Sequence, residues 1–551
     1  MASIQFKLNI EGMTCTDCEK HIVKAVSELG VAQANADFRR NEAVFTAPSD
    51  ISLDRLFKAI RDAGYTPTGV ELRDDPHVEP PSTQAREYDY DFLIIGTGAA
   101  AFSAAIEAAK FDARIALVER SVIGGTCVNV GCVPSKALLR AGEVYHQAGG
   151  HSFAGIYTSA QRVDWQALVD QKDALVKELR KHKYEDLMDA YGFTLLQGDA
   201  KFIDGHTVMV EDQRITSAKF LIATGASPQI PEIEGLSDVS YLTSTSALEL
   251  CAVPDHLVVI GSGFIALEMG QLFRNAGARV TLIKRGDRLL PSYEPEVSEA
   301  VAQVLKRQGI DVIYGATCER VSEEDGIKSV YLIAQGEARV IRGDALLVAA
   351  GRKPNTAGLD LEKANVRIGE KGQVLVVDGM RTSNPDVYAA GDVTLGPQFV
   401  YVAAHQGAIA ASNAVGKEGR KVDLRAVPSV IFTHPAIASV GLTEEEAKAH
   451  GHETRVSILS LEAVPRALVN RDTTGVFKLV ADAKTRKILG VHVVAENAGD
   501  VIYSGVLAIK FGLTIDDVTG TLAPYLTMAE GLKLAALTFD RDVSTLSCCA
   551  G

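Results

Sequence analysis

The sequence lacks the features of a membrane protein and of a secreted protein. Its most apolar stretch, residues 92–109, contains Gly96, Gly98 and Glu107, whereas a membrane-spanning helix needs about 20 mostly apolar residues. The first residues, MASIQFKLNIEGM, do not place a basic region before an apolar block, so no secretory signal is predicted. We therefore expect a cytoplasmic protein, in a compartment where thiols stay reduced.

An excess of positive charge is also absent. Lys and Arg total 56 against 70 Asp and Glu, for a formal net charge of −14. This balance argues against binding to nucleic acid or to an anionic membrane surface. Hydrophobic residues make up 47% of the chain and charged residues 23%, and no segment is of low complexity. The composition is that of a globular protein, and 551 residues predict about three or four domains.

The N-terminal 70 residues are expected to form a small separate domain. Alternating apolar residues predict strands over 4–10 and 43–46, and helical periodicity predicts helices over 17–29 and 53–63. The order βαββαβ is that of a ferredoxin-like sandwich. Residues 71–87 contain three prolines and many charges, which predicts a linker.

From residue 88 onward, strand patterns alternate with helix patterns, which predicts α/β domains with parallel sheets. After residue 425 the pattern changes to strands over 427–441, 475–481 and 488–494, followed by helices over 498–511 and 528–537. The last part of the chain is therefore predicted to be an appended α+β domain.

A glycine motif with the spacing of a dinucleotide site follows the first of these strands. Gly96 suits a tight turn, Gly98 lets the backbone approach a pyrophosphate, and the small Ala101 lets helix and strand pack closely. Glu119 follows the next strand, where an acid accepts hydrogen bonds from ribose hydroxyls. The alternative is a tight turn without a ligand.

The motif occurs a second time as Gly261, Gly263 and Ala266. Here the next strand is followed by Lys284 and Arg285 instead of an acid. Cations at this point pair with a 2′-phosphate, so the second copy is predicted to bind NADPH. Two copies with opposite charges favour two nucleotide sites over two empty turns, and they imply electron transfer from NADPH to a second bound cofactor.

Six of the eight cysteines form three close pairs. The pairs are Cys15 and Cys18, Cys127 and Cys132, and Cys548 and Cys549, and the remaining two are Cys251 and Cys318. Cysteines in a reducing compartment are commonly small hydrophobic residues, and we assign that structural role to Cys251 and Cys318. Three close pairs instead favour chemistry of the thiols themselves.

The second pair lies in the segment GGTCVNVGCVPSK, residues 124–136. Pro134 suits the first turn of a helix, so Cys132 is predicted near a helix N-terminus, where the dipole favours its thiolate. Lys136 adds positive charge one turn further on. Two thiols at this spacing suit a dithiol/disulfide couple beside a flavin.

This segment resembles the redox-disulfide segment of the pyridine nucleotide-disulfide oxidoreductases. The resemblance covers residues 88–551 and includes the segments LIATG, VAAGRKPN and VYAAGD. It implies FAD in the first nucleotide site, with Cys132 as the charge-transfer thiolate and Cys127 as the interchange thiol. Lys136 then corresponds to the flavin-proximal lysine and Glu268 to its carboxylate partner. It also implies a homodimer whose active sites are shared between the subunits.

The resemblance divides the chain and assigns its nucleotide contacts. It implies a metal-binding domain 1–70, a linker 71–87, an FAD-binding domain 88–235 and 355–425, an NADPH-binding domain 236–354 and a dimerisation domain 426–551. The FAD contacts are Gly96, Gly98, Ala101, Glu119, Gly125, Thr126, Lys136, Thr224, Gly225 and Asp392. The NADPH contacts are Gly261, Gly263, Ala266, Lys284, Arg285 and Gly351.

One departure from the family concerns the substrate. Disulfide reductases of this family protonate the leaving thiol with a His that precedes a Pro, and a later Glu orients that His. Here Ala523 stands in its place, while Pro524 and Glu530 remain. A thiol leaving group without its general acid loses roughly 10²–10⁴ in rate, so release of thiols from an organic disulfide is not expected.

Three aromatic residues are also assigned by the resemblance. Tyr184 and Tyr525 are predicted in the substrate pocket, although a role as core aromatics is the alternative. Phe264 stands where relatives often have a tyrosine that gates the nicotinamide.

The two other thiol pairs suit a soft metal ion, because thiolates select soft metals over hard ones. Cys15 and Cys18 lie in GMTCTDC, which resembles the heavy-metal-associated domains. Cys548 and Cys549 lie in the C-terminal CCAG and are predicted to deliver metal, the alternative being a frayed tail.

With PYLTMAEGLKLAA and the CCAG ending, the whole chain resembles the mercuric reductase family. The resemblance implies that NADPH reduces Hg(II) to volatile Hg(0), in mercury detoxification. Cys15 and Cys18 then take up Hg(II), and Cys548 and Cys549 pass it to Cys127 and Cys132 of the other subunit. A mercury transporter or an organomercurial lyase is the implied metal donor. The alternatives are a thiol-disulfide reductase, such as a dihydrolipoyl dehydrogenase, and a metal carrier.

Overall fold

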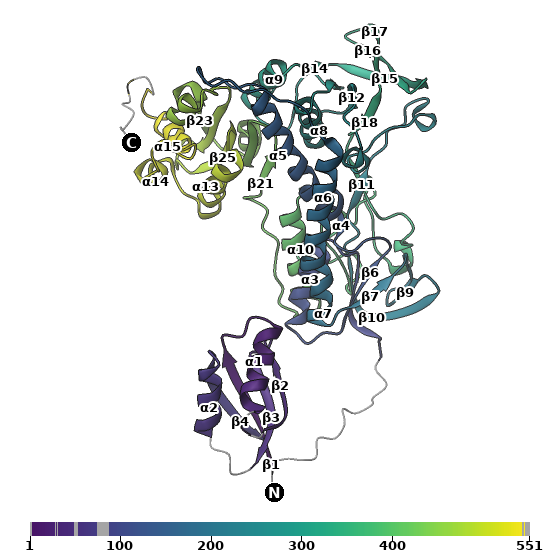
Figure 1. Ribbon diagram of the computed structural model, residues 1–551, viewed down its shortest axis with the longest axis vertical. Helices are drawn as coiled ribbons and strands as arrows, with labels where there is room; N and C mark the ends of the chain where they lie inside the picture. The colour runs from purple at the N-terminus through teal and green to yellow at the C-terminus, as the bar shows by residue number, and fades with distance from the viewer. Residues whose placement is uncertain are drawn as a thin grey trace.

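The computed structural model describes residues 3–73, 87–542 and Thr545, except residues 28, 30 and 49–52. A small N-terminal domain lies against one end of a larger body (Figure 1). Within the described ranges, no helix has both the length and the apolar character needed to cross a membrane.

The N-terminal domain is a four-stranded antiparallel sheet with two helices. Its elements are β1 (Ser3–Glu11), α1 (Thr16–Ser27), β2 (Ala32–Asp37), β3 (Glu42–Pro48), α2 (Leu53–Asp62) and β4 (Thr66–Arg73), with sheet order β2-β3-β1-β4. Leu8, Phe45 and Leu56 are fully buried between sheet and helices. The predicted ferredoxin-like order is confirmed.

The prediction that the linker begins at residue 71 is wrong. Strand β4 continues to Arg73, and residues 71–73 pair with residues 5–7 of β1. The hydrogen bonds offered by β1 override the polar composition of this segment, because backbone pairing does not require apolar side chains. Residues 74–86 of the predicted linker lie outside the described residues.

The turn between β2 and β3 contacts the larger body. Arg40 forms an ion pair with Asp112, and Nη1 of Arg39 donates to the carbonyl of Tyr191 at 3.0 Å. These side chains are exposed, and surface ion pairs contribute little to stability.

A mainly parallel sheet forms the first nucleotide-binding domain. Its strands are β5 (Tyr90–Ile95), β6 (Ile115–Glu119), β7 (Thr194–Gln197), β8 (Ala200–Asp204), β9 (Thr207–Val210), β10 (Gln213–Ile222) and β20 (Val387–Ala389). The order is β7-β6-β5-β10-β9-β8, and β20 also pairs with β10. Phe92, Leu93 and Ile94 are all fully buried, as expected for a parallel strand covered on both faces.

Helices surround this sheet. They are α3 (Ala99–Ala109), α4 (Gly125–Val130), α5 (Cys132–Gly149), α6 (Trp165–Arg180), α7 (Asp186–Tyr191) and α10 (Val400–Ala414). Helices α3 and α10, almost 300 residues apart, pack side by side (Figure 1). This contact brings the segment before α10 close to the first glycine motif.

The second nucleotide-binding domain repeats the arrangement. Its parallel sheet has the order β14-β13-β12-β18, formed by β12 (His256–Ile260), β13 (Arg279–Ile283), β14 (Ile310–Ile313) and β18 (Ala345–Val348), with α8 (Phe264–Asn275) and α9 (Pro295–Arg307). A separate meander contains β15 (Ala316–Glu324), β16 (Ile327–Ala334) and β17 (Glu337–Gly343). The short strands β11 (Ala226–Pro228) and β19 (Arg352–Pro354) pair with each other.

The C-terminal domain is α+β. Its antiparallel sheet has the order β21-β22-β25-β24-β23, formed by β21 (Pro428–Ile431), β22 (Ala436–Gly441), β23 (Thr454–Ser460), β24 (Val476–Asp482) and β25 (Ile488–Ala495). Its helices are α11 (Glu444–Ala449), α12 (Pro465–Asn470), α13 (Ala498–Phe511), α14 (Ile515–Gly520) and α15 (Glu530–Leu537). The predicted fold class, two α/β nucleotide-binding domains with an appended α+β domain, is confirmed.

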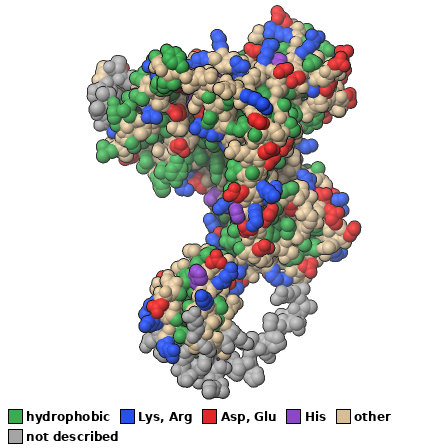
Figure 2. Space-filling view, in the orientation of Figure 1, with side chains coloured by type: hydrophobic (Ala, Val, Ile, Leu, Met, Phe, Trp, Pro, Cys, Tyr) green, Lys and Arg blue, Asp and Glu red, His purple; other side chains and the backbone are tan. Residues whose placement is uncertain are grey.

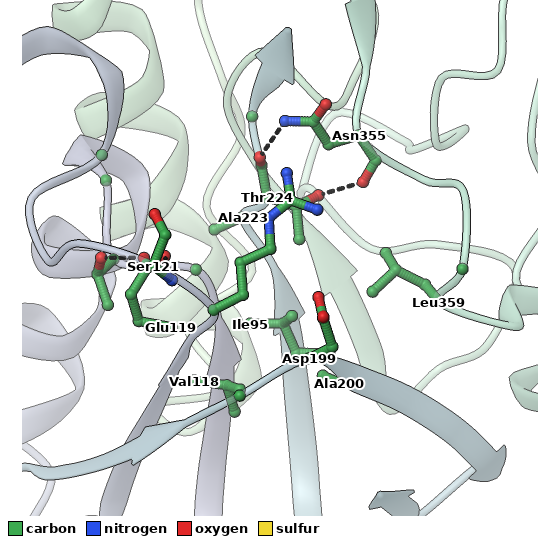
Figure 3. A pocket seen from close by; sticks show the side chains of 18 of the residues that line it. Ile95, Val118, Glu119, Ser121, Asp199, Ala200, Ala223, Thr224, Asn355 and Leu359 are labelled. Carbon is green, nitrogen blue, oxygen red and sulfur yellow. Dashed lines mark hydrogen bonds between the residues drawn. The ribbon is translucent and has the colours of Figure 1, made fainter. Parts of the chain in front are cut away.

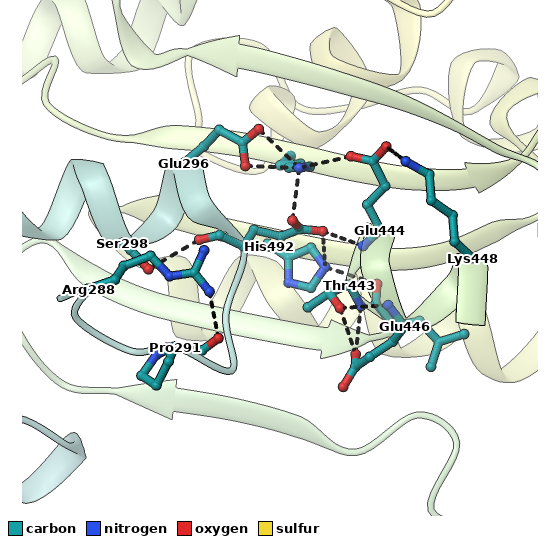
Figure 4. Close-up of polar contacts among 12 residues, drawn as sticks. Arg288, Pro291, Glu296, Ser298, Thr443, Glu444, Glu446, Lys448 and His492 are labelled. Atoms are coloured by element: carbon teal, nitrogen blue, oxygen red, sulfur yellow. Dashed lines mark hydrogen bonds and ion pairs between the residues drawn. The ribbon is translucent and has the colours of Figure 1, made fainter. Parts of the chain in front are cut away.

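A buried charge cluster joins the second nucleotide-binding domain to this sheet. Nζ of Lys478, whose side chain is 2% exposed, lies 2.9 Å from Glu294 and 2.9 Å from Glu296 at the start of α9. Glu444 lies 3.5 Å away, and His492 is packed beside the cluster (Figure 4). Removing one partner of such a cluster leaves a buried charge uncompensated, so the cluster fixes how the two domains meet.

Candidate active site

The first glycine motif opens onto a cavity of about 820 Å³. Seven of the ten predicted FAD contacts line it, namely Gly96, Gly98, Glu119, Gly125, Thr126, Thr224 and Gly225, whereas Ala101, Lys136 and Asp392 do not. Glu119 and Ser121 lie on one side and Thr224 and Asn355 on another (Figure 3). Glu119 accepts the Ser121 N–H at 2.9 Å and also the Thr97 hydroxyl, while the Thr224 hydroxyl donates to the Asn355 carbonyl at 2.7 Å.

The floor of this cavity fits a pyrophosphate. Gly96 has φ +114°, and a Cβ there would lie 2.4 Å from the carbonyl oxygen of Ala223, so the turn requires glycine. A Cβ on Gly98 would meet nothing closer than Gly125 Cα at 3.8 Å. The backbone beside Gly98 is thus open to a ligand at the start of α3. Ala101, in the first turn of α3, is fully buried and does not line the cavity.

The second glycine motif lines a larger cavity, of about 1330 Å³. A Cβ on Gly261 would lie 2.2 Å from the Ala349 carbonyl, whereas one on Gly263 would meet nothing within 4 Å. The open face at Gly263 fits a second pyrophosphate. Lys284, Arg285 and Gly351 also line this cavity. Ala266, in the first turn of α8, is fully buried.

The thiols of Cys127 and Cys132 lie at the junction of α4 and α5. Cys127 is in α4, and Cys132 is the first residue of the 18-residue helix α5. A hydrogen bond from Cys127 lowers the pKa of Cys132 to about 7, the charge of Lys136 acts in the same direction, and burial opposes both. The same hydrogen bond, together with burial, raises the pKa of Cys127 well above its usual range. Cys132 is therefore the thiolate of the pair.

Lys136 and Glu268 form a bridge behind the pair. Nζ of Lys136 lies 2.7 Å from Oε2 of Glu268 and 4.6 Å from the ring centroid of Phe432. Oε1 of Glu268 accepts the Phe432 N–H at 2.9 Å. The bridge thus connects α5 of the first domain, α8 of the second and the segment after β21 of the third.

The predicted pocket tyrosines are separated within one chain. Tyr184, in the π-helical turn Lys181–Glu185, packs edge-on against Phe102 at 4.8 Å. Burial raises the pKa of Tyr184, and electrostatic interactions with Cys127 and Cys132 contribute. Tyr525 is 49% exposed, and its loop between α14 and α15 lies in the C-terminal lobe, apart from α4 (Figure 1).

The loop between α14 and α15 carries Ala523, which has no proton to donate, at the position of the family's histidine. Glu530 accepts the backbone N–H of Leu526 at 3.1 Å and so binds its own loop.

Asp392 does not line either cavity; burial raises its pKa, and Nε of Arg352 lies 3.8 Å from its carboxylate.

Sequence reasoning missed a group of aromatic residues beside the second cavity. Phe399 and Tyr293 line it with Phe264, and Tyr401 stacks on Phe399. The negative charge of Cys132 contributes to raising the pKa of Tyr401, after burial and Tyr293. No motif marks these residues, and only the packing of α10 against the other elements brings them together.

The N-terminal thiol pair lies at the start of α1, where Cys15 is exposed and Cys18 is half-buried. Sγ of Cys15 and Sγ of Cys18 are 3.5 Å apart, and the Thr14 N–H donates to Cys18 at 3.4 Å. The pKa of Cys18 is lowered to about 6, first by this N–H and then by the Tyr65 hydroxyl. The described part of the chain contains no group of three or more His, Cys, Asp or Glu residues that would hold a metal. Cys548 and Cys549 lie outside the described residues.

Comparison with known proteins agrees with this arrangement. Residues 90–407 match the family described as pyridine nucleotide-disulphide oxidoreductase, residues 427–536 its dimerisation domain, and residues 7–66 the heavy-metal-associated domain. A solved structure, the Cu(II) complex of the HOCl-induced flavoprotein disulfide reductase RclA from Escherichia coli, is 31% identical with a TM-score of 0.74, covering 82% of this chain and 99% of that one.

Full-length relatives are more similar. The mercuric reductase of Lysinibacillus sphaericus is 55% identical over 547 residues, which cover 99% of this chain and 100% of that protein. The mercuric reductase of Bacillus cereus is 55% identical over 550 residues, or 99% of this chain and 87% of that protein. That of Shigella flexneri is 40% identical over 569 residues, or 99% and 100%. The two cavities at the glycine motifs, the thiol pair at the junction of α4 and α5 and these similarities establish that the chain belongs to the mercuric reductase family of pyridine nucleotide-disulfide oxidoreductases.

Proposed function

We propose that the protein reduces Hg(II) to Hg(0) at the expense of NADPH, with FAD in the first cavity, NADPH in the second and the metal on Cys127 and Cys132. The observation that carries this proposal is the position of Cys127 and Cys132 at the junction of α4 and α5, one turn before Lys136, which Glu268 holds in an ion pair. Residues on both sides of Cys127, namely Gly125, Thr126, Asn129 and Val130, line the flavin cavity.

Each group of the site has a defined task in this proposal. FAD and NADPH, when bound, supply the two electrons. Cys132 and Cys127 hold the soft metal ion, since thiolates prefer such ions. Lys136 keeps Cys132 deprotonated, and Glu268 holds Lys136 in place. Hg(0) leaves because it binds thiolates poorly, so no thiol leaving group needs a proton. Ala523 is compatible with this chemistry and unsuited to disulfide reduction.

Delivery of the metal involves the other thiol pairs. Cys15 and Cys18 take up Hg(II), and Cys548 and Cys549 of one subunit pass it to the buried pair of the other. Thiolate exchange keeps the metal bound throughout. We place this reaction in the cytoplasm, in mercury detoxification, with a mercury transporter or an organomercurial lyase as the donor.

A homodimer is supported by the surface of the C-terminal domain. Apolar side chains gather on the lobe that contains α13, α14 and α15 (Figure 2). Tyr503, Leu507 and Phe511 follow one face of α13 and are 64%, 38% and 69% exposed. A patch of this kind marks an interaction site. A partner subunit on this lobe would bring its Tyr525 and C-terminal thiols toward the buried pair, to which Tyr184 is adjacent.

NADPH oxidation by the FAD-loaded protein tests the proposal. We expect rapid oxidation with Hg(II) supplied as a thiol complex, together with loss of volatile mercury from solution. Oxidised glutathione and lipoamide should support little oxidation, because Ala523 provides no acid. Rapid oxidation only with a disulfide would refute the proposal in favour of a thiol-disulfide reductase. Stoichiometric Hg(II) binding without NADPH oxidation would refute it in favour of a metal carrier.

A further inference from the structure

Helices α6 and α7 are joined by the π-helical turn Lys181–Glu185. The N–H of Asp186 donates to the carbonyl of Lys181, five residues earlier. An α-helix pairs residues four apart, so this turn contains one residue more. Each later side chain therefore takes the position that the preceding residue would have in an uninterrupted α-helix. Single π-helical turns are rare, and many of them lie at functional sites.

The extra residue decides which side chain faces the interior after α6. Val169 and Val176 lie on the buried face of α6. At 3.6 residues per turn, an uninterrupted α-helix would continue this face to about residue 183. That residue is a lysine, which is exposed in the structure. The half-buried Tyr184 takes the inward position instead and packs edge-on against Phe102.

Two ion pairs have the same spacing as the π-helical turn. Nε of Arg180 lies 3.4 Å from Oε1 of Glu185, and Nζ of Lys181 lies 2.9 Å from Oδ1 of Asp186. Both pairs join residues i and i+5, which an α-helix separates by about 140° around its axis. The two pairs therefore stabilise the π-helical turn and not an α-helical one.

Arg180 also connects this turn to the helix that carries the first thiol. Nη1 of Arg180 donates to Oδ1 of Asn129 at 3.2 Å. Nδ2 of Asn129 donates in turn to the carbonyls of Ile123 and Gly125, at 2.9 Å and 3.1 Å. These bonds hold the start of α4, in which Cys127 lies. Arg180 thus contacts both the turn that contains the tyrosine and the helix that contains the thiol.

The turn places the Tyr184 ring next to the thiol segment. A Cβ on Gly124, the residue before α4, would lie 3.4 Å from Cδ2 of Tyr184. The ring therefore lies beside the backbone of this segment. Cys127 and Cys132 both interact electrostatically with the Tyr184 hydroxyl, which indicates that the hydroxyl is near the two thiols.

We propose that Arg180 is a positioning residue, which fixes the π-helical turn to α4 through Glu185 and Asn129 and so holds Tyr184 beside the thiol pair when the metal binds. This inference rests on the proposed function, because it takes Cys127 and Cys132 to be the metal site. Arg180 also lines the flavin cavity, so its test has to separate an effect on Tyr184 from an effect on FAD.

Arg180→Met removes the ion pair and the hydrogen bond and keeps a long side chain. We expect the KM for Hg(II), supplied as a thiol complex, to rise by about 2- to 12-fold, the value of one hydrogen bond. The kcat, the FAD content and the rate of flavin reduction by NADPH should stay unchanged, because none of them involves Tyr184. Arg180→Lys keeps a positive charge near Glu185 and should recover part of the loss.

The experiment uses the full-length, FAD-loaded protein. Steady-state NADPH oxidation gives the KM and kcat for Hg(II), and stopped-flow mixing with NADPH without metal gives the rate of flavin reduction. Arg180→Met, Tyr184→Phe and the double variant form a cycle. If Arg180 acts through the tyrosine, Arg180→Met has no further effect in the Tyr184→Phe background.

Lys177→Met is the matched control. Lys177 is exposed in the last turn of α6, and its side chain forms no ion pair with any residue that the structure describes, so its KM should stay unchanged. Should Arg180→Met fail to fold, Glu185→Gln takes its place. That variant keeps the bond to Asn129, and we expect a smaller rise in KM.

The outcomes separate this inference from the proposed function. An unchanged KM in Arg180→Met, or a rise that persists in the Tyr184→Phe background, would overturn the inference and leave the proposed function intact. Loss of FAD or slower flavin reduction in Arg180→Met would also overturn the inference, since Arg180 would then act on the flavin. Absence of Hg(II)-dependent NADPH oxidation in the unsubstituted protein would overturn both.

Discussion

The two described thiol pairs differ in how the protein controls their charge. Cys15 is exposed and Cys18 is half-buried, and local donors, the Thr14 N–H and the Tyr65 hydroxyl, lower the pKa of Cys18 to about 6. Cys127 and Cys132 are partly buried between domains. Burial disfavours the thiolate form of both residues. In Cys132 the hydrogen bond from Cys127 and the charge of Lys136 outweigh this effect, so its pKa is lowered.

Under the proposed function, this difference separates capture of the metal from its reduction. The lowered pKa keeps Cys18 a thiolate over a wide pH range, and the exposed Cys15 beside it is accessible to a metal complex. A buried pair with one thiolate and one thiol is protected from competing ligands and stays next to the flavin cavity. Under the proposed function, the same residue type would perform two tasks, and four predictions test the distinction.

The largest effect is expected from Cys132→Ala. Loss of the thiolate ligand should lower Hg(II)-dependent NADPH oxidation at least about 100-fold, since even residues that merely support a metal ligand cost 10- to 100-fold. Hg(II) binding by Cys15 and Cys18, measured by equilibrium dialysis, should persist. Cys251→Ala removes an exposed thiol outside both pairs and should leave turnover unchanged. Equal loss in both variants would mean that turnover does not depend on the buried pair.

Lys136→Met should have the next largest effect. Without the positive charge the pKa of Cys132 rises above about 7, so less thiolate is present at neutral pH. Alkylation of the reduced enzyme by iodoacetamide, followed by mass spectrometry of the Cys132 peptide, should slow severalfold at pH 7. Glu268→Gln is the opposing control, because the Glu268 charge raises this pKa and its removal should lower it. A shift in the same direction in both variants would contradict an electrostatic origin.

The pH dependence of alkylation should differ between the pairs in the unsubstituted protein. Thiolate is lost as pH falls through each pKa, so Cys132 should reach half of its maximal rate near pH 7 and Cys18 near pH 6. At pH 6.5, Cys18 is therefore mostly thiolate and Cys132 mostly thiol. Coincident profiles for the two peptides would remove the proposed distinction.

The smallest effect is expected from Tyr65→Phe. Loss of the hydroxyl should raise the pKa of Cys18 only in part, because the Thr14 N–H is the larger cause and remains. The alkylation profile of Cys18 should shift to higher pH, while that of Cys132 stays in place. Tyr157→Phe removes a hydroxyl from a side chain that is 95% exposed and should change neither profile. Movement of the Cys132 profile would show that the pairs are coupled.

Local sequence specified much of this molecule. Both glycine motifs, the charges after their second strands and the spacing of each thiol pair lie within short segments. Residues so close in sequence lie together whenever the predicted strand and helix form, whatever the rest of the fold. The βαββαβ element order of the N-terminal domain also followed from short-range periodicity, whereas the pairing of β1 with β3 and β4 joins strands that are not neighbours in sequence.

Tertiary structure decided the features that join distant segments. Phe264 at the start of α8 stacks on Phe399, which immediately precedes α10. Lys478 meets Glu294 because α9 lies against the C-terminal sheet. Strand β4 extends to Arg73 because β1 supplies its hydrogen bonds. In the sequence, nothing distinguishes a single aromatic residue, a single lysine or the polar end of a strand from other residues of the same kind. Its role depends on which partner the rest of the chain brings within contact distance, and no local pattern carries that information.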